Sequence, residues 1–161
     1  MRKIGIIAVL SLMALALAAV PALAQSPHFI GTPTCTKSLT TGLTCSGKAA
    51  GLGTDPTQAF LTSDSVTASY TCVNKGGNVA PGQPVVTAPF NGTPTTITPR
   101  NGQITFSGIN LPVPTAPSAA SQCPNGNWKL RLDSLLYTNV VLHIQQDGVD
   151  ILTFSFGNID P

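Results

Sequence analysis

Apolar and polar residues alternate with a period of two along most of the chain after residue 24. The clearest run covers 127–133, where apolar residues at even positions share one face and polar or charged residues occupy the other. The same pattern returns at 140–145 and at 152–156. Because successive side chains of a β-strand point to opposite faces, this alternation predicts half-buried strands. We expect the core to contain Trp128, Leu130, Leu132, Leu142, Ile144, Phe154 and Phe156.

Turn signals divide the chain into about eight short strands. Weaker alternation marks earlier strands at 28–37, 43–49, 66–72, 86–90 and 104–106. Pro33 restricts the first of them to a sheet edge or a bulge. Asp147-Gly148 tolerates the positive φ angles of a type I′ turn, which predicts a hairpin between the last two strands. Segments 74–84 and 111–122 are expected to be long loops. This arrangement predicts an all-β fold, an antiparallel β-sandwich that is immunoglobulin-like in style.

The first 24 residues are typical of a secretory signal peptide. Two basic residues precede an apolar stretch over 4–20, and Ala22-Leu23-Ala24 matches the small residues that a signal peptidase reads. We therefore expect cleavage before Gln25 and a single, secreted domain over 25–161. An uncleaved membrane anchor is the alternative interpretation. After cleavage we expect no insertion into a membrane.

Charge is sparse and nearly balanced in the expected mature chain. After the signal peptide, six basic residues remain against six aspartates, and there is no glutamate. Proteins that bind nucleic acid or an anionic membrane by electrostatic attraction carry an excess of basic residues. The composition therefore argues against a nucleic-acid partner. An extracellular protein or a glycan is the expected kind of partner.

Four cysteines lie in the exported part of the chain, which predicts two disulfides. We expect Cys35 to pair with Cys45, because the SLTTG segment between the two flanking strands can turn the chain back on itself. Cys72 and Cys123 then pair by elimination, and also by position, since one ends a strand and the other enters a strand. We therefore expect CPNGNW, 123–128, to provide a disulfide cross-link and the start of a strand, with no catalytic role. A metal site is the weaker alternative, because there is no C-x-x-C pair and the histidines are not nearby in the sequence.

Four segments together resemble a family of small secreted bacterial proteins. They are GKAAGLG at 47–53, TCVNKGGNVAPGQ at 71–83, NGQITF at 101–106 and CPNGNW at 123–128. The family carries the same cysteine-bearing GGN-x-x-PGQ loop and the same C-P-N-G-N-W segment, and the resemblance covers most of the mature chain. It implies an exported location and a style of fold, but no chemistry and no functional residues. The additional Cys35 and Cys45 depart from the commoner pattern of the family.

The sequence favours no catalytic, metal or cofactor site. Nucleophilic catalysis needs a nucleophile, a base and a group that orients the base. Only His28 and His143 supply an imidazole, and no G-x-S-x-G segment is present. The glycines and the lysine of 74–78 are not followed by the helix that a phosphate-binding loop requires. We therefore expect no catalytic residue, no metal and no cofactor.

One strand face remains as a candidate binding face. It contains Tyr137, Asn139, Val141, His143 and Gln145, opposite to the apolar side of the same strand. Aromatic and amide groups on a flat sheet suit contact with a sugar or a protein, although an ordinary outer face has the same pattern. We expect a secreted, non-enzymatic protein that serves as a surface or interaction module. A carbohydrate- or small-ligand-binding module using the 137–145 face is the alternative, and a secreted hydrolase or inhibitor is least favoured.

Overall fold

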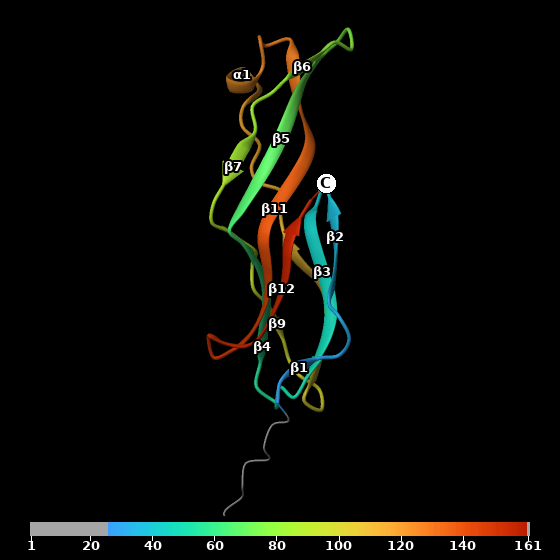
Figure 1. Ribbon diagram of the computed structural model, residues 1–161, viewed down its shortest axis with the longest axis vertical. Helices are drawn as coiled ribbons and strands as arrows, with labels where there is room; N and C mark the ends of the chain where they lie inside the picture. Colours follow the sequence, from blue (N-terminus) through green and yellow to red (C-terminus); the bar gives the residue numbers. More distant parts are fainter. Residues whose placement is uncertain (1–25, 161) are drawn as a thin grey trace, which may run out of the picture.

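The computed structural model describes residues 26–160, in which two antiparallel β-sheets pack as a sandwich (Figure 1). The smaller sheet consists of β1 (His28–Phe29), β2 (Thr34–Ser38), β3 (Gly42–Ala50) and β10 (Gln103–Leu111). The larger sheet consists of β4 (Thr57–Ser63), β5 (Ser65–Asn74), β6 (Val79–Pro81), β7 (Val85–Thr87), β8 (Phe90–Asn91), β9 (Thr95–Ile97), β11 (Trp128–Gln146) and β12 (Val149–Ile159). A short helix, α1 (Ala119–Gln122), precedes β11. The predicted sandwich is confirmed, whereas the predicted signal peptide 1–24 and its cleavage before Gln25 lie outside the described residues.

The strands are more numerous and more unequal than predicted. Residues 26–160 hold twelve strands where about eight were expected. Two of them, β1 and β8, are only two residues long, whereas β11 runs for 19 residues. Short edge strands are hard to recognise in a sequence because they contain too few residues for a period to repeat. The immunoglobulin-like style stays a prediction.

The long strand β11 organises the larger sheet. Its first half pairs with β5, and its second half pairs with β4 on one edge and with β12 on the other. β4 and β5 are separated only by Asp64, so the two follow β11 as one nearly continuous strand. The expected hairpin between β11 and β12 is confirmed, since Gln146 pairs with Val149 and Asp147 and Gly148 take φ angles of 51° and 77°.

Two irregularities reverse the side of β11 that is buried. Leu132 pairs with Tyr70 and Ser134 with Ser69, which leaves Asp133 as an extra residue. The register with β12 shifts again between Tyr137 and Val140, where Asn139 takes a φ of 50°. An extra residue moves every following side chain to the other face. The inward positions of β11 are therefore even before Asp133, odd between the two irregularities, and even again after Asn139.

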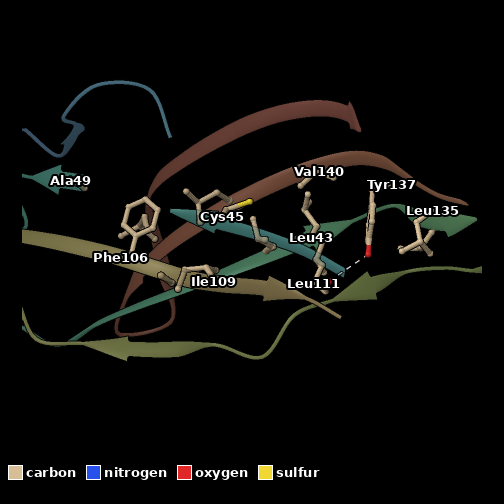
Figure 2. Packing of buried hydrophobic residues seen from close by; sticks show 14 of the residues in the cluster. Leu43, Cys45, Ala49, Phe106, Ile109, Leu111, Leu135, Tyr137 and Val140 are labelled. Atoms are coloured by element: carbon tan, nitrogen blue, oxygen red, sulfur yellow. Dashed lines mark hydrogen bonds between the residues drawn. The ribbon is translucent and has the colours of Figure 1, made fainter. Parts of the chain in front are cut away.

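The core lies between the two sheets (Figure 2). Its largest fully buried side chains include Tyr137, Phe106, Leu43 and Leu111. Of the residues predicted for the core, Leu142 and Ile144 are confirmed as fully buried. The remaining predicted residues other than the tryptophan are partly buried against this cluster: Leu130, Leu132, Phe154 and Phe156.

The prediction of a core position for Trp128 was wrong. Trp128 is partly exposed and does not belong to the core cluster. Figure 1 shows the reason: β5 and the first half of β11 run past the end of β2 and β3, so the smaller sheet does not cover the start of β11. The alternation in 127–133 thus predicts a strand correctly but not the depth of burial, which depends on the second sheet.

Both predicted disulfides are confirmed. Cys35 and Cys45 lie opposite each other in the β2–β3 pair. Cys72 on β5 is bonded to Cys123, which follows α1 and precedes β11. A disulfide that spans 51 residues restricts the unfolded chain by about 4 kcal/mol in the entropic model, and one that spans 10 residues by about 3 kcal/mol. The first pair fastens the edge of the smaller sheet, and the second holds the 112–123 segment against β5.

Candidate functional site

The outer face of β4, β11 and β12 gathers polar side chains in register. Residues directly opposite each other in an antiparallel pair point to the same side of the sheet. Val141 therefore lies between Thr62 and Ser155, His143 between Phe60 and Thr153, and Gln145 between Gln58 and Asp150. These nine residues are called the outer face below. Asn91 on β8 and Thr96 on β9 extend it beyond β4.

His143 is held at the centre of the outer face by two hydrogen bonds. Its Nδ1 lies 2.9 Å from Asp150 Oδ2, and its Nε2 lies 3.0 Å from Thr62 Oγ1. An ionised carboxylate only accepts hydrogen bonds, so Nδ1 carries the proton. In the neutral imidazole Nε2 is then an acceptor, and the Thr62 hydroxyl donates to it. Thr62, His143 and Asp150 thus form one directional hydrogen-bonded chain across three strands.

The Asp150 carboxylate keeps its charge in this chain. Burial alone raises its pKa, but hydrogen bonds from His143 and Gln145, together with the positive charge that His143 can carry, outweigh that effect and lower the pKa below its ordinary value. The Asp150 side chain is 38% exposed, which leaves it accessible to a ligand. The outer face consequently presents a carboxylate that stays ionised at neutral pH.

Phe60 fixes the imidazole further. The Phe60 and His143 rings are parallel to within 8°, with centroids 4.9 Å apart. Only 19% of the His143 side chain is exposed, because the ring is packed between its neighbours. A side chain that is stacked and hydrogen-bonded at both nitrogens has little rotamer freedom left to lose when a ligand binds. The centre of the outer face is therefore preorganised.

The outer face offers hydrogen-bonding groups of several kinds. Its amides, hydroxyls and carboxylate supply donors and acceptors, and it contains no lysine or arginine.

The Thr62–His143–Asp150 chain has the order of a nucleophile, a base and an orienting group. Stabilising an oxyanion requires N–H groups aimed at the substrate. On this part of β11 the backbone lies between β4 and β12, and its N–H groups are directed along the sheet toward those strands.

The structure keeps three of the five predicted face residues together. Val141, His143 and Gln145 lie on the outer face as expected. Tyr137 does not: the prediction was wrong because the irregularity at Asn139 turns Tyr137 to the opposite side. The Tyr137 side chain is fully buried, burial raises its pKa, and its hydroxyl donates to the Leu111 carbonyl oxygen at 3.5 Å.

Asn139 is exposed but has a structural role. Its side-chain amide donates to Asp64 Oδ2 at 2.6 Å, and its backbone N–H donates to Asn158 Oδ1 at 3.0 Å. Asp64 separates β4 from β5, so these bonds join the break in one strand to the irregularity in its neighbour. Asn139 therefore shapes the sheet and does not belong to the outer face.

The sequence reasoning missed the contribution of β4. Gln58, Phe60 and Thr62 alternate with Ala59 and Leu61, which is the period of a half-buried strand. This signal was present but was not used, so Phe60 and Thr62 were not expected beside His143. Asp150 was not expected beside His143 either.

Two absences concern the described residues, 26–160. Within this range, no three or more His, Cys, Asp or Glu side chains lie close enough together to hold a metal ion. The same residues include no helix with the length and apolar character needed to cross a membrane.

The chain was also compared with known proteins. It gives no significant match to a protein-family model, to a curated protein or to a solved structure.

Proposed function

We propose that this chain is a secreted, non-enzymatic β-sandwich module that binds carbohydrate through the outer face. The observation that carries the proposal is the fixed His143, which is stacked on Phe60 and hydrogen-bonded to Asp150 and Thr62. Sugars present many neutral hydroxyl groups, each of which donates and accepts hydrogen bonds. A surface of amides, hydroxyls and one carboxylate complements such a ligand, and a preorganised surface loses little entropy on binding.

The location is part of the same proposal. Two disulfides favour an oxidising, extracellular environment. We include export of the chain through the signal peptide 1–24, a bacterial source and an immunoglobulin-like arrangement of the strands. N-terminal sequencing of the exported protein tests the first part, with Gln25 expected as the first residue.

A glycan array followed by calorimetry tests the binding function. Gln145→Ala is expected to weaken the binding of the best glycan by up to about tenfold, since a typical hydrogen bond contributes roughly 0.5–1.5 kcal/mol. His143→Ala should weaken binding by a similar factor, because Thr62 and Asp150 then lose the partner that positions them. Gln103→Ala is the matched control, because Gln103 is exposed on β10 in the other sheet. Absence of binding to every glycan, or unchanged binding by His143→Ala, contradicts the proposal.

A second candidate function, ester hydrolysis, is favoured by the Thr62–His143–Asp150 chain. In this reaction Thr62 Oγ1 attacks the acyl carbon while His143 Nε2 takes the hydroxyl proton and passes it to the departing alcohol. Water then releases the acid and restores Thr62. We rank this function second because the paired strands direct their N–H groups along the sheet and leave an oxyanion unsupported. Turnover of p-nitrophenyl acetate that disappears in Thr62→Val would place hydrolysis first.

A further inference from the structure

A separate pocket lies at the far end of β5 and β11, remote from the outer face. It is open to solvent, has a volume of about 450 Å³ and is lined by Val73, Asn74, Lys75, Gly126, Asn127 and Lys129. One wall is the turn that follows β5, and the other is the turn that precedes β11. In Figure 1 this is the end of the molecule that carries β6 and α1. The outer face around His143 lies 14 positions further along β11 than Lys129.

Both walls of the pocket are held in place. In the 74–78 turn, the Asn74 carbonyl accepts from Gly77 N at 3.0 Å, and the Asn74 side-chain oxygen accepts from Asn78 N at 2.9 Å. In the second turn, Asn125 accepts in the same two ways from Trp128 N at 3.2 Å and from Asn127 N at 3.0 Å. The Cys72–Cys123 disulfide then ties the two walls together. The pocket is therefore preformed, which lowers the entropic cost of filling it.

The charge of the pocket is positive. Lys75 and Lys129 are exposed on opposite walls, and among residues 26–160 neither forms an ion pair. Asp133, the acidic residue nearest to Lys129 along β11, is paired with Arg131 at 2.9 Å. Asn74 and Asn127 add amide groups to the lining. Two unpaired ammonium groups beside neutral donors attract a carboxylate or a sulfate.

We propose that this pocket binds an acidic sugar unit, with its carboxylate or sulfate between Lys75 and Lys129. Its volume falls within the range of about 300–1,000 Å³ that is typical of small-molecule sites, so it has room for an organic ligand and not only for a free anion. The site is distinct in chemistry from the outer face, which has no lysine or arginine. The proposal is independent of the proposed function, because neither site shares a residue with the other.

An NMR titration of the purified, disulfide-bonded protein tests the proposal. Sodium glucuronate is the probe, glucose is its neutral counterpart, and sodium sulfate is the free anion. We expect glucuronate to shift the amide signals of Gly126, Asn127 and Lys129 in a saturable way, glucose to leave them unchanged, and sulfate to bind at least threefold more weakly. Removing one of two exposed charges weakens such contacts by up to about fivefold. Lys75→Gln and Lys129→Gln should therefore each bind glucuronate more weakly by up to that factor.

The matched control is Lys48→Gln, which removes one exposed positive charge from β3 in the other sheet. Because the three lysines are exposed, all three variants should retain the wild-type circular dichroism spectrum. Equal shifts with glucose would overturn the proposal, since charge would then play no part. If sulfate binds as tightly as glucuronate, the pocket is a site for a free anion and not for a sugar. If Lys48→Gln weakens glucuronate binding as much as Lys75→Gln and Lys129→Gln do, the ligand is attracted by the charge of the whole protein and not by this pocket.

Discussion

Replacing Tyr137 by alanine should destabilise the protein more than replacing Trp128, although tryptophan is the larger side chain. Tyr137 is fully buried, and Figure 2 shows it among Leu43, Leu111 and Leu135 in the core. Its truncation removes buried surface and leaves a cavity, which costs about 3–5 kcal/mol. Trp128 remains partly exposed and lies outside the core cluster, so its truncation leaves no closed cavity and should cost about 1–2 kcal/mol.

Urea unfolding followed by far-UV circular dichroism measures both values without relying on tryptophan fluorescence. With about 4 °C per kcal/mol for a domain of this size, the Tyr137→Ala midpoint should fall by about 12–20 °C in a thermal scan. Tyr137→Phe is the control for the hydroxyl group. Its loss should stay below about 1 kcal/mol, because the hydrogen bonds to Leu111 and Pro112 are long, at 3.5 and 3.4 Å.

The comparison refutes the burial pattern of β11 if Trp128→Ala costs as much as Tyr137→Ala. Such a result would mean either that Trp128 is buried as deeply as Tyr137 or that Tyr137 is not in the core. Unequal denaturant slopes among the variants would indicate a changed unfolded state and would require a second method.

Two further predictions concern the backbone and pH. Gly42 has a φ of 85°, and an added Cβ would collide with the Leu111 carbonyl oxygen, so Gly42→Ala should cost more than about 3 kcal/mol. Gly31 has a φ of 72° but open space around it, so Gly31→Ala should cost only about 1–2 kcal/mol in the same urea assay; equal losses would contradict this. Because folding lowers the pKa of Asp150, its contribution to stability is complete above the unfolded value of about 3.9 and is lost as pH falls through the folded value. Between pH 5 and pH 2, the free energy of unfolding should therefore depend less on pH for Asp150→Asn than for the wild type. Identical dependence of the unfolding free energy on pH in the two proteins would contradict this prediction.

Features that depend on neighbouring residues were predicted well. The period-two pattern placed the last strands and the Asp147-Gly148 hairpin, because alternation and turn chemistry act over a few residues. The two disulfides were also predicted. Cys35 and Cys45 flank a short segment that can reverse the chain, and the remaining pair followed by elimination and from its position between a strand end and a strand start.

The candidate site was predicted only in part. His143 was correctly placed on an outer face, but its partners Thr62 and Asp150 come from strands on either side of β11. Thr62 is 81 positions away in the sequence. No local pattern states which strands become neighbours, so the hydrogen-bonded chain could be recognised only once the sheet was assembled.

The sequence by itself determined the strand character of the chain, its main turns and its cysteine pairs, since each depends on residue type and short spacing. Only the tertiary structure decided which side of β11 is buried at each point. The extra residue at Asp133 and the left-handed conformation of Asn139 coincide with shifts in the register of β11 against β5 and β12, and each shift turns the following side chains to the other face. These shifts take Tyr137 into the core, whereas Trp128 stays partly exposed because the smaller sheet does not cover the start of β11 (Figure 1).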